Sequence, residues 1–391
     1  MIILDVIFSI VAFVSAFLSM QLFLGLKSSN TSDANNFSGM DKCVILIPAH
    51  NEELGIRKTI MSAKNEAREG DLILVVADNC SDNTATVSRG AGAMCIERTN
   101  KELVGKGHAL QYGIDYLTQK DFDFKTIVVM DADCSFGEGS LQTLLNESQK
   151  RNCVAQALYL MKSPNISNIK LNVSEFTWLI KNWVRPLGQK RLGISCHLQG
   201  SGMAFPKSIL DKYSLASSSI VEDLELGLHI VKGGEKVSFV SNALVTSEFP
   251  ENSEGLDNQR KRWEHGHLSV VKEMPYVMLQ GLKQLNFRLF FQALDAAIPP
   301  TIIWIMLTIF TLVASFITAI FDGFYWSTII AACICVFAVA LICVWLKYGK
   351  KILPSAQLIG IVPFVLSKFS VYRTFISNRE KSWVRTKRDN E

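Results

Sequence analysis

The sequence lacks the cysteine patterns that mark disulfide frameworks and zinc sites. Its nine cysteines are scattered, no Cys-x-x-Cys pair occurs, and three of them lie in one apolar run near the C-terminus. An odd number of cysteines without metal-ligand spacing indicates neither a disulfide framework nor a zinc centre. Reduced thiols of this kind are typical of a cytosolic compartment.

Two further absences narrow the functional classes. The sequence has neither a Gly-x-Gly-x-x-Gly fingerprint nor a P-loop, so dinucleotide binding and Walker-type ATP binding are not supported. The net charge is only +4, and the Lys and Arg residues gather near apolar runs rather than in a basic tract. No nucleic-acid partner is therefore expected.

Long uncharged apolar runs are present instead. Residues 6–26, 296–321 and 323–346 are each long enough to span a bilayer. The first run is too long for a signal-peptide core and lacks a basic start and a small-residue cleavage site, which indicates a retained anchor. A fourth run, residues 352–367, is short and contains two prolines. We expect it to be re-entrant or interfacial, with a fourth span as the alternative.

The basic residues beside these runs predict the topology. Lys27 follows the first run, the link at 322–323 has no Lys or Arg, and three lysines lie within 347–351. The basic tail at 385–388 continues this bias. By the positive-inside rule, the region between the first and second runs and the tail lie in the cytoplasm. We therefore expect a multi-pass protein of the inner (plasma) membrane.

The predicted domain organisation follows from these runs. We expect an N-terminal anchor at 1–27, a linker at 28–41, a cytoplasmic domain at 42–275, an interfacial segment at 276–295, two transmembrane helices at 296–347, and an interfacial or re-entrant stretch with a basic tail at 348–391.

The region between the runs has the pattern of an α/β domain. Apolar stretches at 43–47, 72–77 and 127–130 each precede a polar loop, and the sequence after each loop suits a helix. This repetition predicts a doubly wound α/β sheet. Each of the three loops carries acids, and the carboxyl ends of strands in such sheets meet at the edge that binds ligands.

Two features of this edge suggest an anionic ligand held with a metal. Asp131 and Asp133 are spaced so that both side chains lean to one side of the sheet, and they would repel each other without a cation between them. Mg²⁺ or Mn²⁺ suits two carboxylates. Lys106 lies between glycines at a helix start, where an anion is favoured. The alternatives are a solvated Asp-x-Asp turn and a flexible turn with a solvated lysine.

Three motifs later in the sequence are each weak evidence for a function when taken alone. The small residues Gly200-Ser201-Gly202 indicate that the backbone here comes close to another group. Glu222-Asp223 lies at a helix start, which ordinary dipole compensation also explains. Residues 259–263, Gln-Arg-Lys-Arg-Trp, would alone be a basic segment close to the membrane.

Taken in order, the motifs resemble those of the membrane-embedded family 2 glycosyltransferases. That group includes cellulose, chitin, hyaluronan and poly-N-acetylglucosamine synthases and many exopolysaccharide transferases. The matching segments are residues 48–53, the Asp78 loop, 131–133, 200–202, 222–223 and 259–263, and the tail at 383–388 is similar to that of exopolysaccharide members.

The resemblance implies a GT-A-like nucleotide-sugar-binding domain with transmembrane helices, one N-terminal and two C-terminal. It implies an inverting transfer from a nucleotide sugar, UDP-linked in our expectation, to a hydroxyl of a cell-surface polysaccharide or lipid-linked oligosaccharide. Asp223 would be the general base and Asp133 would hold Mg²⁺ or Mn²⁺. The expected donor-binding residues are Pro48, Ala49, Asn51, Glu52, Asp78, Lys106 and Asp131. The residues expected at the diphosphate and the acceptor are Gln199, Gly200, Gln259, Arg262 and Trp263.

Three alternatives stay open. The acceptor could be polyprenyl phosphate itself, although the 259–263 motif belongs to the polysaccharide branch of the resemblance. The chain could also be an inactive assembly subunit, against which the acids at 131, 133 and 223 argue. A transporter is disfavoured because the spans contain no ionisable residue. Processive synthases generally have more than three spans, so we expect either a partner protein of polysaccharide assembly or a non-processive enzyme acting on a lipid-linked acceptor.

Overall fold

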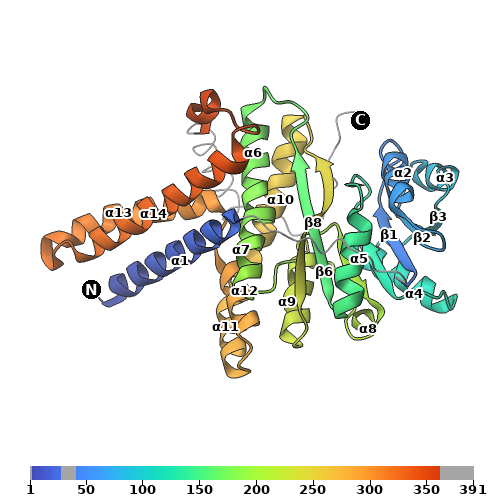
Figure 1. The fold of residues 1–391 in the computed structure, drawn as a ribbon, viewed down its shortest axis with the longest axis horizontal. Coiled ribbons are helices and arrows are strands. Elements are labelled where there is room, and N and C mark those ends of the chain that lie inside the picture. Colours follow the sequence, from blue (N-terminus) through green and yellow to red (C-terminus); the bar gives the residue numbers. More distant parts are fainter. Residues whose placement is uncertain (1, 28–40, 362–391) are drawn as a thin grey trace.

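A computed structural model of the protein describes residues 2–27 and 41–361 (Figure 1). Residues 28–40 of the expected linker, the last part of the fourth apolar run (362–367) and the basic tail lie outside the described residues. The described chain consists of an α/β domain and three long helices, joined by shorter helices at their base.

The α/β domain is built on one eight-stranded sheet with the strand order β3-β2-β1-β4-β7-β6-β8-β5 in the described chain. The strands are β1 Cys43–Ala49, β2 Leu72–Asp78, β3 Met94–Arg98, β4 Thr126–Val129, β5 Ser135–Phe136, β6 Val154–Lys162, β7 Met203–Pro206 and β8 Val237–Glu248. Strands β3, β2, β1 and β4 are parallel, whereas β7 is antiparallel to both β4 and β6. The predicted α/β fold is confirmed, and the sheet is mixed because β7 enters it between β4 and β6.

Helices cover both faces of the sheet. They are α2 Ile56–Glu66, α3 Thr84–Gly90, α4 Lys106–Gln119, α5 Ser140–Arg151, α6 Ile169–Leu179, a π-helical segment Ile180–Val184, α7 Arg185–Arg191, α8 Lys207–Leu210, α9 Glu222–Lys232 and α10 Ser253–Val271.

Strand β1 shows why its sequence is apolar at every position. Val44 and Leu46 pack into the core that contains α4, whereas Ile45 and Ile47 pack into the core that contains α2 and α5. Successive side chains of a strand point to opposite faces, so a strand covered on both faces is apolar throughout. The same burial brings the polar residues after β1, β2 and β4 to one edge of the sheet.

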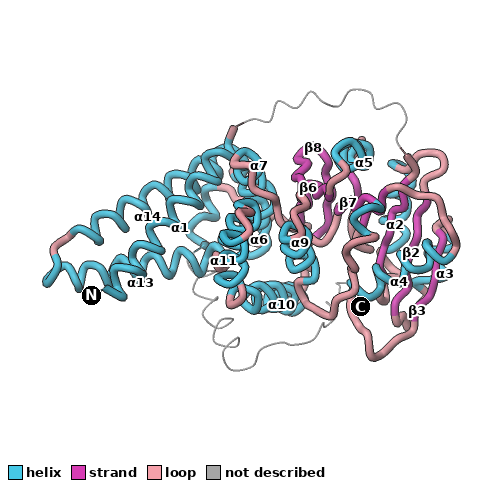
Figure 2. The backbone as a smooth tube through the Cα atoms, turned by 90° about the horizontal axis from the view of Figure 1, so that it is seen from below, coloured by secondary structure: helices cyan, strands magenta, loops and turns pink. Residues whose placement is uncertain are grey.

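The three long helices match the predicted apolar runs. They are α1 Ile2–Leu26, α13 Thr301–Asp322 and α14 Tyr325–Val344, which a π-helical segment extends to Gly349. Each is long and apolar enough to cross a membrane. They lie side by side and leave the α/β domain together (Figures 1 and 2).

Helices α6, α7, α11 Met274–Lys283 and α12 Phe287–Ala297 run crosswise to the long helices at their base (Figure 1). Helix α7 touches the backbone of α1. A Cβ on Gly188 would lie 2.1 Å from the carbonyl oxygen of Gln21, and one on Gly25 would lie 2.2 Å from that of Val184. The guanidinium of Arg191 donates to the carbonyls of Leu24 and Lys27 at the end of α1. The anchor and the α/β domain are therefore joined by direct backbone packing.

Gly188→Ala should test this junction. The added methyl group would overlap the backbone of α1, and overpacking of this kind costs about 1–3 kcal/mol. We expect a lower unfolding temperature in detergent than for the wild type. Gly90→Ala is the control, because the nearest heavy atom to its Cβ would be 3.9 Å away. Equal stability of Gly188→Ala and the wild type would contradict the close contact.

Candidate active site

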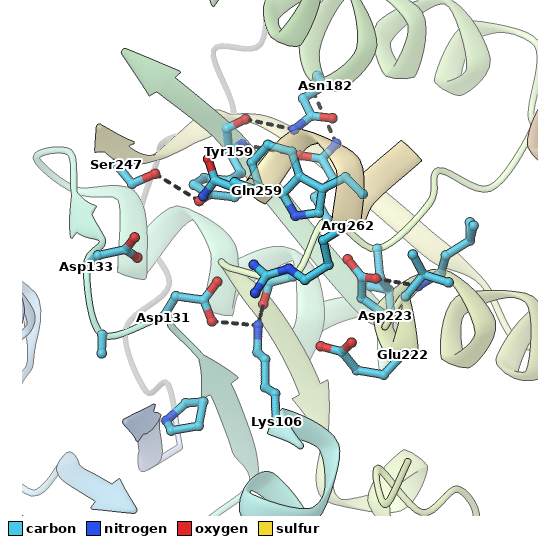
Figure 3. A pocket seen from close by; sticks show the side chains of 18 of the residues that line it. Lys106, Asp131, Asp133, Tyr159, Asn182, Glu222, Asp223, Ser247, Gln259 and Arg262 are labelled. Atoms are coloured by element: carbon cyan, nitrogen blue, oxygen red, sulfur yellow. Dashed lines mark hydrogen bonds and ion pairs between the residues drawn. The ribbon is translucent and has the colours of Figure 1, made fainter. Parts of the chain in front are cut away.

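A cavity of about 740 Å³ lies at the carboxyl ends of β1, β2 and β4. It extends from Pro48 and Asp78 on one side to Asp295, next to the start of α13, on the other. Open α/β sheets bind ligands at this edge, and Figure 3 shows the polar side chains that point into the cavity.

The structure brings the predicted site residues together, with the exception of Asn51. Residues that line the cavity are Pro48, Ala49, Glu52, Asp78, Lys106, Asp131, Asp133, Gln199, Gly200, Asp223, Gln259, Arg262 and Trp263. Asn51 does not line it. Its backbone has a positive φ of 55°, and its side-chain oxygen accepts a hydrogen bond from the amide of Ser81 at 2.7 Å. Asn51 therefore joins the loops after β1 and β2.

Asp78 is held by a residue that the sequence analysis did not identify. Arg98 donates to Asp78 Oδ1 at 2.6 Å, and both side chains are buried. The two residues are register partners on the parallel strands β2 and β3. A buried charge pair of this kind fixes the direction of the Asp78 carboxylate. His50, also in the cavity, contacts the carbonyl of Asp78 at 2.7 Å.

Lys106 links three segments of the chain at the centre of the cavity. It comes from the start of α4, lies 2.5 Å from Asp131 Oδ1 and donates to the carbonyl of Gly200 at 2.8 Å (Figure 3). Gly200 has a φ of +89°, and a Cβ there would lie 3.4 Å from Asp223 Oδ2. A side chain at position 200 would therefore be strained and would crowd the charged groups.

The acidic side chains around Lys106 outnumber this one lysine. Burial raises the pKa of Asp131, with Asp133 and Asp223 adding to the effect and Lys106 opposing it. Burial and the neighbouring Asp223 raise the pKa of Glu222 to about 8. A carboxyl whose pKa rises in this way is in surroundings that disfavour further negative charge. A bound cation would reduce this electrostatic repulsion between the carboxyl groups.

Asp131 and Asp133 fit a divalent metal ion. Ligand atoms of Asp131, Asp133 and Cys134 lie within 4.8 Å of one another. Burial raises the pKa of the Cys134 thiol well above its usual value, so this residue stays protonated and is a poor ligand. The two carboxylates remain, and carboxylate oxygen is the donor that Mg²⁺ and Mn²⁺ prefer.

Part of the cavity was not anticipated from the sequence. Residues Trp178, Lys181, Arg185, His197, His267 and Asp295 line the side next to the long helices, and we call this group the junction end. The first three lie on one face of the helix formed by α6, the π-helical segment and α7. Their spacing of three and four residues is that of a helix face, and π-helical turns occur frequently at functional sites.

Comparison with known proteins decides the family. Residues 41–266 match the family described as "Glycosyltransferase like family 2". This chain belongs to glycosyltransferase family 2.

One curated protein and one solved structure are similar to this chain. The probable glycosyltransferase YdaM of Bacillus subtilis (strain 168) is 25% identical over 270 residues, which are 66% of this chain and 62% of that protein. The mannosyltransferase PcManGT from Pyrobaculum calidifontis, solved in complex with GDP-Man and Mn²⁺, has a TM-score of 0.56 at 12% sequence identity. The superposition covers 96% of this chain and 99% of PcManGT, so the two share a fold.

The cavity also contains two acids at the start of α9, Glu222 and Asp223. Both line the cavity, and Figure 3 shows them on the same side as Lys106 and Arg262. The backbone amide of Leu224 donates to Asp223 Oδ1 at 2.8 Å, which stabilises a negative charge on that carboxylate. The two acids have similar positions at the start of α9, but their surroundings differ.

Asp133→Asn should weaken metal binding. The change removes one anionic ligand, so we expect the affinity for Mn²⁺ to fall at least about tenfold. Mn²⁺ binding can be followed by electron paramagnetic resonance without any turnover. Asp211→Asn is the control, since Asp211 is exposed and pairs with Lys207. Wild-type affinity in Asp133→Asn would show that the metal is held elsewhere.

Proposed function

We propose that this glycosyltransferase moves a sugar from a UDP-linked donor to a hydroxyl of a cell-surface polysaccharide or of a lipid-linked oligosaccharide, with inversion at the anomeric carbon. The observation that carries the proposal is the convergence of Asp131, Asp133, Asp223, Lys106 and Arg262 in one cavity of a family 2 fold. These groups supply the charges that the transfer needs.

The donor end of the cavity suits a nucleoside diphosphate. Pro48, Ala49, Glu52 and Asp78 would contact the nucleoside, and Asp131 and Asp133 would hold Mg²⁺ or Mn²⁺. When bound, the metal would supply positive charge to the diphosphate. PcManGT, with the same fold, was solved with GDP-Man and Mn²⁺.

Arg262 and Lys106 would meet negative charge that develops on the leaving diphosphate. Figure 3 shows Arg262 pointing into the cavity on the side of Lys106 and Asp131. A guanidinium matches phosphate oxygens in geometry, and fixed donors aimed at developing charge are among the largest contributions to catalysis.

Asp223 would accept the proton of the acceptor hydroxyl. A hydroxyl is a weak nucleophile at neutral pH and needs such a base. Glu222 is less suited, because burial and the neighbouring Asp223 raise its pKa and favour its protonated form. A base opposite the leaving group gives a single displacement with inversion. Polyprenyl phosphate as the acceptor is disfavoured, since an ionised phosphate oxygen needs no base.

Aromatic residues would hold the acceptor sugar. The rings of Trp263 and Trp178 have centroids 4.8 Å apart, and both residues line the cavity. Gln199, Gly200 and Gln259 lie in the same cavity and would complete this contact.

In this proposal the enzyme lies in the plasma membrane, with the α/β domain on the cytoplasmic side. Three helices that are long and apolar enough to span a bilayer support it. Lys and Arg flank the ends of the helices that lead into that domain. Helices α11 and α12 then form the expected interfacial segment. Membership of the exopolysaccharide branch and a partner protein of polysaccharide assembly belong to the same proposal.

Asp223→Asn tests the proposed function. We expect release of nucleoside diphosphate from a panel of nucleotide sugars with glycan acceptors to fall about 10²–10⁴-fold, the usual contribution of a general base. Donor affinity should change little, because the donor contacts lie on other loops.

Glu222→Gln is the matched comparison and should lose much less activity. Normal turnover by Asp223→Asn together with an inactive Glu222→Gln would move the base by one residue. No release by the wild type with any donor and acceptor would contradict the proposed function.

A further inference from the structure

The junction end of the cavity lies against the ends of two long helices. Trp183 stacks near Tyr348 with ring centroids 4.8 Å apart. A Cβ on Gly349, where α14 and its extension end, would lie 2.6 Å from the Phe176 ring. Arg191 donates to carbonyls at the end of α1. The helix that carries Lys181 is therefore fixed at the depth where the long helices end.

Arg185 donates hydrogen bonds to two side chains at the junction end. It donates to Asp295 at 2.6 Å and to Gln21 of α1 at 3.2 Å. Asp295 also accepts from Gln21 at 2.8 Å and contacts His197 at 3.1 Å. Burial by itself raises the pKa of Asp295, but Arg185 and His197 outweigh it and hold that pKa well below its usual range. Arg185 and Asp295 thus neutralise each other.

The two histidines of the junction end each contact another residue. His197 contacts Asp295. Burial lowers the pKa of His267 to about 4, and Lys181 adds to the effect. His267 is therefore neutral at physiological pH, with Nε2 against the carbonyl of Ala296 at 2.9 Å.

Lys181 is the cation that remains. Its side chain is open to the cavity, and no ion pair joins it to an acid among residues 2–27 and 41–361. Its nearest specific contact is the ring of Trp178, whose centroid is 5.5 Å from Nζ. Burial lowers the pKa of Lys181, and Arg185 adds to the effect while Asp223 opposes it. An anion in the cavity beside Lys181 would stabilise its charge.

We propose that Lys181 binds a phosphate of the acceptor, and that the acceptor is a saccharide linked to a lipid through a phosphate or diphosphate. This rests on the proposed function and selects one of its two acceptor classes. A neutral polysaccharide offers no anion for Lys181. Lipid phosphates lie at the depth where transmembrane helices end, which is where the structure holds this lysine.

The neighbouring residues suit such an acceptor. Trp178 and Lys181 are three residues apart and therefore adjacent on one helix face. Trp178 is also paired with Trp263. A phosphate on Lys181 would place the attached sugar on the paired indole rings, with its free hydroxyls directed toward the side of the cavity that contains Asp223.

Acceptors with and without a charged phosphate linkage test the inference. Each sugar of a panel would be offered as its farnesyl diphosphate ester and as its uncharged octyl glycoside. We expect the wild type to prefer the diphosphate esters. Lys181→Met should raise KM for these esters about 10–100-fold, because a charge-assisted hydrogen bond is lost. The KM for the donor and for octyl glycosides should not change.

Two variants serve as controls. Lys181→Arg keeps the charge and should retain most of the affinity for the esters. Lys170→Met removes an exposed lysine of α6 that does not line the cavity, and it should behave as the wild type. If Lys181→Met raises KM equally for both acceptor types, the residue is merely structural and the inference is wrong.

The outcomes also separate this inference from the proposed function. Transfer to octyl glycosides with the same KM as to the diphosphate esters would leave the proposed function standing and overturn the inference. No transfer to either acceptor type would overturn the proposed function itself, and the inference with it.

Inhibition by simple phosphates identifies the source of the anion. We expect farnesyl phosphate to compete with the acceptor in the wild type but about tenfold less well in Lys181→Met. Equal inhibition by inorganic phosphate would point to a free anion and contradict a lipid-linked one. Competition by phosphatidylglycerol in nanodiscs, compared with phosphatidylcholine alone, would point to an ordinary lipid headgroup and also contradict the inference.

Discussion

The concentration of negative charge beside Lys106 is the constraint on which the site depends. Asp131, Asp133 and Asp223 come from two distant segments, and Lys106 forms a 2.5 Å ion pair with Asp131. Glu222, whose raised pKa favours its protonated form, is the neighbour of Asp223. Like charges in a poorly solvated cavity repel strongly. The fold tolerates them because Lys106 also ties the loop at Gly200 to the end of β4. What remains is a cavity that favours cations, which supports the metal and diphosphate site proposed for it.

A second cluster of charged side chains, centred on Asp295 and Arg185, joins the α/β domain to the long helix α1. Asp295 and Arg185 are buried, and buried charges are stable only when their partners are complete. Gln21 completes this group from within α1, and His197 completes it from the loop before β7. Any tilt of α1 would break these hydrogen bonds. Gln21 of α1 thus holds Asp295 and Arg185, two residues that line the cavity.

Local pattern predicted much of this structure. Strands β1, β2 and β4 are short and mostly apolar, and each of the three long helices contains a long uncharged run, so each is visible in the sequence by itself. Most of the residues singled out from the order of motifs line one cavity. Strands β6, β7 and β8 were not predicted, because β7 runs antiparallel between strands that are distant in sequence. Asn51 was misplaced relative to the cavity because its αL backbone turns its side chain toward the neighbouring loop.

The junction end depends on tertiary contacts that no local pattern encodes. Gln21 and Asp295 are 274 residues apart, and Gln21 lies in a run whose apolar character alone indicates a membrane span. Lys181 acquires its proposed role only because Arg185, one turn later, is neutralised by Asp295. The central claim, a single displacement promoted by one base, is tested most directly by the anomeric configuration of the product. Nuclear magnetic resonance of the first product from an α-linked donor should show a β linkage, whereas an α linkage would contradict the account.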